Sequence, residues 1–303
     1  FFLAGCRGKP ALPAQVENEQ LTYFGFALVD CGFDAPNDEE GVTNYIEEVA
    51  GFTNIGQLCV FAPDEPVGER LALFRQHGVK ALLYVEGILF EHVPHALAPM
   101  GTKLVLRADA EARWAAFVAL NREGLTAENI AALYLADEPT WNGLSEAELA
   151  RAVQIVEALL PGLPTMVIEG YPVVDKMVVP EALDWVGFDR YDLFEPDTDK
   201  AWLDALAQVY AARTRADQKI VIIASTQWLP EYASGAGVQP DEMVDVVTRY
   251  EKIARSYPDV VALLGYTWPG GFDAPEQLGA RDLPALRGAL EELGKKILEN
   301  EDQ

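Results

Sequence analysis

The sequence is poor in basic residues, cysteine and histidine. Its 23 lysines and arginines face 48 aspartates and glutamates, which gives a net charge of −25. A surface this negative repels nucleic-acid phosphates and anionic lipid headgroups, so it argues against nucleic-acid binding and against a polybasic membrane patch. Three cysteines are too few for a disulfide framework, and three histidines provide few ligands for zinc. No apolar run reaches the roughly 18 residues that a membrane-spanning helix needs.

The remaining composition is that of a folded protein with a large core. Half of the 303 residues are hydrophobic and 23% are charged, which excludes disorder for most of the chain. This length equals about two average domains, but single closed α/β barrels also reach it.

Strand-like and helix-like segments alternate eight times along the chain. Most of the strand-like segments are near-continuous apolar runs, such as Val221-Ile222-Ile223-Ala224, which are typical of parallel strands buried on both faces. The expected strands are Thr22–Asp30, Ile55–Phe61, Lys80–Glu86, Ala131–Asp137, Pro164–Glu169, Asp184–Asp189, Lys219–Ser225 and Val261–Thr267.

Helical patterns fill the intervals between these strands. A capping box at Ser145 to Glu148 begins one helix, and an apolar stripe from Leu286 to Ile297 marks the last one. The fifth helix, in Tyr171–Leu183, is the weakest because prolines interrupt it, and 87–108 and 229–238 are expected to be long loops. Eight strand–helix units predict a single (β/α)8 barrel. An open doubly wound sheet is the second choice, but no glycine-rich phosphate loop follows the first strand.

The segment Leu3-Ala4-Gly5-Cys6 resembles the lipobox of bacterial lipoproteins. That resemblance implies that residues 1–5 end a signal peptide, that Cys6 is acylated, and that the protein is anchored to a membrane outside the cytoplasm. Residues 6–20 then form the lipidated cysteine and a proline-rich polar tether, and 21–303 form the barrel.

Cys31 and Cys59 lie near the ends of the first two expected strands. An exported compartment permits a disulfide between them. Two buried free thiols are nevertheless the favoured expectation, because neighbouring parallel strands rarely offer disulfide geometry.

Acidic and aromatic residues gather where the expected strands end. In a barrel these ends converge on one face, where substrates bind. Carboxylates hydrogen-bond sugar hydroxyls and aromatic faces stack on sugar rings, so the pattern predicts a carbohydrate site. The residues are Asp30, Glu86, Asp137, Glu138, Glu169, Asp189, Tyr191, Gln227, Trp228 and Trp268, with Trp141 three residues past Glu138.

The run Ala136-Asp137-Glu138-Pro139 resembles the strand-four signature of the large clan of retaining (β/α)8 glycosidases, in which the motif reads Asn-Glu-Pro. The resemblance implies that Glu138 is the general acid, with a raised pKa that keeps it protonated near neutral pH. Trp268 matches the clan's tryptophan under the sugar, and Tyr191 is compared with its site tyrosine. Trp228 and Trp268 are expected to form the stacking floor.

The seventh strand departs from the clan, because Gln227 stands where the nucleophilic glutamate is expected. A neutral amide cannot form a glycosyl ester, so three alternatives remain open. Asp189 or Glu169 acts as the base of an inverting enzyme. The Asp137–Glu138 pair supports cleavage assisted by the substrate's own acetamido group. In the third alternative the protein binds a glycan without cutting it.

The other polar candidates are weaker. Asp30 and Glu86 are equally compatible with a site and with pairing or helix capping. Glu91, His92 and His95 allow a metal site, but a solvated loop is favoured because no further ligand is near in sequence.

The sequence therefore predicts a lipid-anchored glycoside hydrolase that acts on a polysaccharide or glycoconjugate outside the cytoplasm. Glu138 is its expected general acid and Asp189 or Glu169 its second carboxylate, and no cofactor is expected. The alternative is a catalytically inactive glycan-binding lipoprotein on the same barrel.

Overall fold

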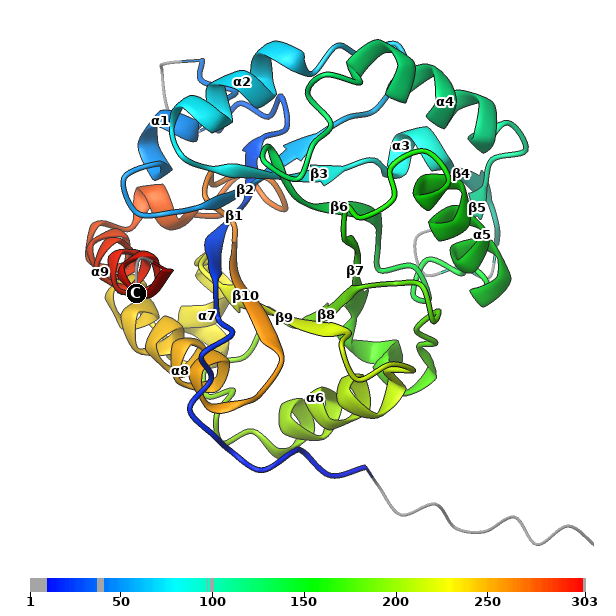
Figure 1. Cartoon of the computed structure of the whole chain (residues 1–303). Coiled ribbons are helices and arrows are strands. Elements are labelled where there is room, and N and C mark those ends of the chain that lie inside the picture. The colour runs from blue at the N-terminus through cyan, green and yellow to red at the C-terminus, as the bar shows by residue number, and fades with distance from the viewer. Residues whose placement is uncertain (1–9, 37–40, 97, 99–100, 302–303) are drawn as a thin grey trace, which may run out of the picture.

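Eight parallel strands close into a barrel in the order β1-β2-β3-β6-β7-β8-β9-β10, and helices surround it (Figure 1). This computed structural model describes residues 10–36, 41–96, 98 and 101–301. The predicted (β/α)8 barrel is confirmed. Its strands are β1 (Tyr23–Asp30), β2 (Ile55–Cys59), β3 (Lys80–Tyr84), β6 (Ile130–Asp137), β7 (Thr165–Gly170), β8 (Trp185–Asp189), β9 (Lys219–Ser225) and β10 (Val260–Tyr266).

The helices lie outside the barrel, where each covers the apolar outer face of the strands. The Ser145–Glu148 capping box is present at the start of α5, and the apolar stripe of α9 is buried as predicted. Within the described residues, no helix has both the length and the apolarity needed to cross a bilayer. The helices are α1 (Ile46–Val49), α2 (Gly68–Gln76), α3 (Glu86–Leu89), α4 (Ala110–Asn121), α5 (Glu146–Glu157), α6 (Lys200–Ala212), α7 (Pro230–Gly235), α8 (Met243–Ser256) and α9 (Pro284–Glu301), with short 3-10 turns at Tyr171–Lys176, Pro240–Glu242 and Ala280–Asp282.

Both segments predicted as long loops contain regular structure. The segment 87–108 holds most of α3 and an antiparallel hairpin of β4 (Phe90–Pro94) and β5 (Thr102–Leu106), and 229–238 holds α7. Only one face of the hairpin is apolar, with Phe90 and Leu104 buried, so its composition resembled that of a loop. The weak fifth helix is replaced by the 3-10 turn at Tyr171–Lys176, as its prolines suggest.

The barrel interior has its own apolar core, separate from the layer under the helices. Its buried side chains come from alternate positions of the strands, among them Ile55, Leu82, Met166 and Val221, and Trp185 adds the largest of them. Because these side chains fill the barrel, a ligand has room only at its ends.

Part of the predicted tether packs against the barrel. Asn18 is buried, and its side-chain amide donates to the carbonyls of Ala254 and Val260 at 2.8 and 2.9 Å. The tether prediction is therefore wrong for the residues nearest β1, because a buried asparagine fixes them. Cys6 and residues 1–5 lie outside the described residues.

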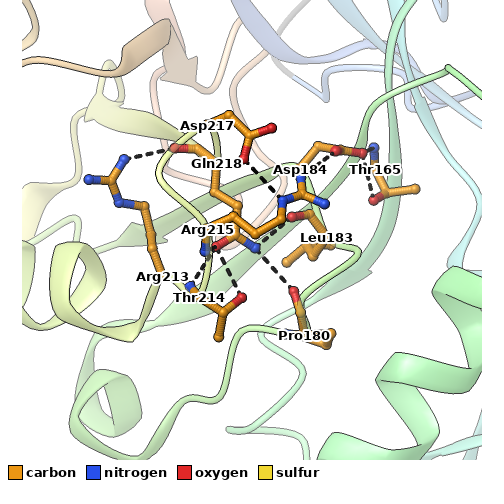
Figure 2. Close-up of polar contacts among 9 residues, drawn as sticks. All are labelled: Thr165, Pro180, Leu183, Asp184, Arg213, Thr214, Arg215, Asp217 and Gln218. Atoms are coloured by element: carbon orange, nitrogen blue, oxygen red, sulfur yellow. Dashed lines mark hydrogen bonds and ion pairs between the residues drawn. The ribbon is translucent and has the colours of Figure 1, made fainter.

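A polar network joins the amino ends of β7, β8 and β9 (Figure 2). Fully buried Gln218 donates through Nε2 to the carbonyls of Pro180 and Leu183 at 3.1 and 2.7 Å, and its Oε1 accepts from the Thr214 and Arg215 amides at 2.7 and 3.0 Å. Because these contacts satisfy the side chain fully, this end of the barrel has a structural role, and the site is sought at the carboxyl ends.

Cys31 and Cys59 form a disulfide, so the expectation of two free thiols is wrong. The register between β1 and β2 shifts between Phe26 and Asp30, after which Asp30 pairs with Leu58. Cys31 therefore follows the end of β1 directly opposite Cys59, with their Cα atoms 4.6 Å apart. The sequence pattern carries no sign of this irregularity, on which the pairing depends.

Replacing both cysteines with serine is expected to lower the free energy of unfolding by about 3 kcal/mol, because the bond closes a chain segment of about 28 residues in the unfolded state. Urea unfolding without reductant measures this difference. A reductant should destabilise the wild type to the level of the double variant and leave the variant unchanged. Equal stability of the two proteins without reductant would contradict the disulfide.

Candidate active site at the barrel mouth

A cavity of about 320 Å3 lies at the carboxyl ends of the barrel strands. Its floor is made by apolar interior residues, including Leu82, Ile168 and Leu264, and carboxyl groups and aromatic rings form the wall above. The volume is at the small end of the range for ligand pockets. None of the residues lining this cavity is a lysine, arginine or histidine.

Asp137 ends β6 and lines the cavity. The Tyr134 hydroxyl donates to its Oδ1, and its own amide donates to Glu86 Oε2 at 2.8 Å. Asp137 as a whole is exposed, and its place in the cavity wall removes part of the water from around its carboxyl group. This desolvation, opposed by the Tyr134 hydrogen bond and supported by Glu138, Glu86 and Glu169, raises the pKa of Asp137 to about 7.

Glu138 and Asp189 form a hydrogen-bonded carboxyl pair at the edge of the cavity. One of them must carry a proton to donate in this bond. Burial is the main cause that raises the pKa of both groups; the charge of Glu169 adds to it at Glu138, and those of Asp137 and Glu138 add to it at Asp189. The pair therefore retains a proton under conditions in which an isolated carboxyl group loses it.

The local backbone directs Glu138 toward Asp189. Its φ of 45° lies in the left-handed region, which non-glycine residues rarely adopt. Gly170, at the end of β7, leaves room for the side chain, because a Cβ at this position would lie 2.8 Å from Glu138 Oε1. A strained backbone that is held by its surroundings is common at functional sites.

Glu169 does not join this pair. It is 1% exposed, and its carboxylate accepts hydrogen bonds from the amides of Thr140 at 2.9 Å, Trp141 at 3.2 Å and Gly170 at 2.9 Å. These bonds hold the turn after β6, which carries Glu138. Glu169 is thus a positioning residue for this turn, and it is absent from the cavity lining. Trp141, partly exposed, lies beside Gly170 at the same rim.

Trp268 does not lie under the cavity, so its predicted place in a stacking floor is wrong. It is completely buried, with its ring centroid 4.9 Å from that of Phe26 and 5.8 Å from that of Phe52. Its Nε1 donates to Glu48 at 2.8 Å. The chain after β10 directs the indole into the layer between the barrel and the helices, away from the mouth.

Trp228 also belongs to the scaffold. It is half-buried, its Nε1 donates to the Val238 carbonyl at 2.9 Å, and its backbone pairs with Leu278. It is absent from the cavity lining. Its predicted stacking role is therefore wrong as well.

Other aromatic residues surround the cavity. Tyr191 and Tyr266 stack with their ring centroids 4.3 Å apart, and the Tyr191 hydroxyl donates to Asp189 at 2.9 Å. Phe61 and Phe272, 57% and 49% exposed, extend the wall outward, and Phe33 packs edge-on against Phe272. The sequence places Tyr191 and Tyr266 at strand ends, but of these five aromatic residues only Tyr191 was predicted to bind substrate. The signal was present, because Phe33 and Phe61 each stand two residues past a strand-end cysteine.

Asp30 and Glu86 have different positions. Asp30 is buried and accepts from Arg70 Nε at 2.7 Å, so it anchors α2 and does not line the cavity. Glu86 begins α3 beside Asp137, with His92 Nε2 3.5 Å away, and burial raises its pKa. Among the described residues no group of three histidine, cysteine or acidic side chains is arranged to hold a metal ion.

Gln227 is turned away from the cavity into a buried amide network. It is 2% exposed, and its Oε1 accepts from Gln277, whose own Oε1 accepts from the amides of Phe272 and Asp273 at 2.7 and 2.9 Å. Asp273 in turn accepts from the Tyr266 hydroxyl at 2.9 Å. Gln227 therefore supports the loop that carries Phe272, and its predicted contact with substrate is wrong.

No protein-family model matches the chain, and no curated protein matches its sequence. Solved structures do resemble it. A GH113 β-mannanase from Alicyclobacillus acidocaldarius in complex with ManMIm aligns with a TM-score of 0.57 at 13% identity, over 91% of this chain and 97% of that one. Another GH113 β-1,4-mannanase gives 0.56 at 13% identity, over 91% and 99% of the two chains. Gas2p of Saccharomyces cerevisiae, in complex with laminaritriose and laminaritetraose, gives 0.54 at 11% identity, over 95% and 69%. These similarities establish the barrel fold.

Proposed function

We propose that this protein is a glycoside hydrolase that cleaves a polysaccharide or glycoconjugate in the cavity at the barrel mouth. One observation carries the proposal: the proton-sharing Glu138–Asp189 pair stands at the edge of a cavity whose wall presents a separate carboxyl group, Asp137. An acid and a base on one ligand site are what glycoside hydrolysis requires. Gas2p, a fold neighbour solved in complex with laminaritriose and laminaritetraose, supports a carbohydrate ligand for this protein.

Glu138 is the general acid in this proposal. Burial and the charge of Glu169 favour a proton on it, whereas its hydrogen bond with Asp189 opposes this. When the glycosidic C–O bond breaks, that proton passes to the leaving oxygen, and the negative charge left behind is shared by the pair. The raised pKa values of both groups keep a proton on the pair at a higher pH than isolated carboxyl groups would. Glu169 keeps the acid in place through the turn that it binds.

Asp137 is the base. A pKa of about 7 leaves it substantially ionised at neutral pH, so it accepts a proton from a water molecule while the oxygen of that water attacks the anomeric carbon. The water supplies the new C–O bond, Asp137 takes its proton, and Glu138 supplies the proton on the leaving group. This balanced step needs no covalent glycosyl–enzyme ester and hence no carboxylate at position 227.

The second candidate function is glycan binding without cleavage, and the burial of Gln227 favours it. Release of reducing ends from a broad glycan panel, combined with calorimetric binding to the same glycans, separates the two. The proposal expects release from at least one glycan, and the Glu138→Gln variant serves as the matched control. Binding without any release would establish the binder in place of the hydrolase.

Converting Gln227 to glutamate is expected to destabilise the protein without creating a nucleophile. The new carboxyl group would lie buried against the Gln277 network, so the free energy of unfolding should fall by roughly 2–3 kcal/mol. Urea unfolding and the rate of glycan cleavage measure the two effects, with the exposed helix residue Gln154→Glu as control. Higher activity at unchanged stability would contradict the structural role of Gln227.

We further infer that Cys6 is acylated and tethers the barrel to a membrane outside the cytoplasm. The Leu3-Ala4-Gly5-Cys6 run supports this assignment, and the Cys31–Cys59 disulfide supports an oxidising compartment. In the native host, Cys6→Ser should move the protein from the membrane fraction to the soluble fraction. A variant that stays with the membrane would contradict lipid anchoring.

A further inference from the structure

The geometry points to a substrate class for this site: we infer that the cavity selects a sugar residue that carries a free, protonated amino group, as in a glucosamine oligomer. This inference rests on the proposed function and narrows it. Three independent features of the cavity support it: carboxyl groups without a basic residue beside them in the lining, a hydrogen-bond donor that no described residue uses, and walls of tyrosine.

The first feature is the absence of positive charge beside the cavity carboxyl groups. Asp137 and Asp189 line a cavity whose lining includes no basic residue. The nearby arginines have other partners: Arg190 pairs with Asp192 and Asp199, at 3.1 and 3.5 Å. A ligand cation would supply the charge that the protein does not, and it would be attracted most strongly where water is excluded.

The second feature is Gln57 on β2. It is 8% exposed and lines the cavity, and its Oε1 accepts from the Leu28 amide at 2.8 Å. Its NH2 group donates to none of the described residues. Because Oε1 is fixed by the Leu28 amide, the NH2 group is held in the cavity wall, where a ligand oxygen can accept from it. A sugar hydroxyl or ring oxygen provides that acceptor, which a simple amine lacks.

The third feature is the tyrosine wall. Tyr84 and Tyr134 lie with ring centroids 5.0 Å apart, and Tyr191 and Tyr266 stack at 4.3 Å. Tyrosine faces attract cations as well as sugar C–H groups. The hydroxyls of Tyr134 and Tyr191 donate to Asp137 and Asp189, so they orient these carboxyl groups as acceptors for an ammonium group.

An amino sugar satisfies all three features together. Its ammonium group meets the carboxylates and the tyrosine faces, and its oxygens meet Gln57. A neutral glucose oligomer offers the carboxyl groups no cation, and an N-acetylated oligomer carries an acetyl group on the amine and therefore lacks its charge. We therefore expect the amino form to bind at least about tenfold more tightly than either.

Calorimetry tests this order near pH 7, at which Asp137 is about half ionised. The four ligands, of matched length, are glucosamine, N-acetylglucosamine and glucose oligomers and an oligolysine peptide. The peptide reports attraction by the overall charge of −25. Asp137→Asn and Asp189→Asn should each reduce the amino-sugar preference about tenfold or more. Glu111→Gln, which removes an exposed carboxylate on α4 outside the cavity, should leave the preference unchanged. Thermal melting verifies that each variant folds.

The outcomes are distinct. Preferred binding of the glucosamine oligomer that depends on Asp137 or Asp189 supports the inference. The inference is overturned if the N-acetylated or glucose oligomer binds as tightly as the glucosamine oligomer or more tightly. It is also overturned if oligolysine binds as tightly as the glucosamine oligomer. Either result leaves the proposed function standing. If neither these sugars nor any glycan of the broad panel binds, the proposed function itself fails.

Discussion

Replacing Glu138 with glutamine is expected to lower the rate of glycan cleavage about 1000-fold while leaving glycan affinity nearly unchanged. The amide has the shape of the carboxyl group and can still donate to Asp189, so the turn and the cavity keep their form. It has no proton to transfer to the leaving oxygen. Initial rates of reducing-end release and calorimetric binding, measured on the same preparation, separate the two effects.

The matched control is Glu148→Gln on α5, which changes a carboxylate of the same length outside the cavity. It should cost stability through its capping box and leave the rate per folded molecule intact. If Glu138→Gln retained more than about a tenth of the wild-type rate, Glu138 would not be the acid. A loss of binding equal to the loss of rate would instead give Glu138 a role in affinity.

Asp137→Asn is expected to reduce cleavage by at least about 100-fold and to remove a step from the pH profile. The base works only when ionised, so the wild-type rate should rise with pH through the Asp137 pKa of about 7. The asparagine variant should lack that rise. Measuring the pH dependence of kcat/KM for both proteins tests the assignment; a wild-type rise centred near pH 4 would contradict it.

Asp137→Asn is expected to lower the cleavage rate but to raise the stability of the protein above neutral pH. The pKa of Asp137 is raised in the folded state, so its protonated form is favoured there and stability is lost as the pH rises through about 7. Asparagine cannot ionise, so the variant should be more stable than the wild type at pH 8. Thermal melting at pH 8 and pH 4 should show a gain only at the higher pH. If the asparagine variant melted at a lower temperature than the wild type at both pH values, Asp137 would have a structural role.

The strands could be predicted from the sequence because parallel barrel strands are apolar on both faces. The same pattern placed Glu138 and Asp189 at strand ends that converge on one mouth, as a closed barrel requires. Their mutual hydrogen bond could not be predicted, because it depends on the left-handed backbone at Glu138 and on the absence of a side chain at Gly170.

The two tryptophans show that the position of a strand end does not determine the direction of the side chains that follow it. Trp228 and Trp268 follow their strands by a few residues, beyond the point at which strand alternation fixes which way a side chain faces. Both turn toward the scaffold, and phenylalanines in the loops after β1, β2 and β10 take the aromatic positions at the mouth. The direction of the Gln227 side chain could not be predicted either, because its hydrogen-bond partner Gln277 is 50 residues away in sequence.

A crystal structure of the Glu138→Gln variant with a bound oligosaccharide tests the central claim most directly. We expect a sugar ring in the cavity, with a glycosidic oxygen beside residue 138 and hydrogen bonds to Asp137 and Gln57. An oligosaccharide bound elsewhere on the surface, with the cavity holding only water, would contradict the assignment of the barrel mouth as a glycoside-cleaving site.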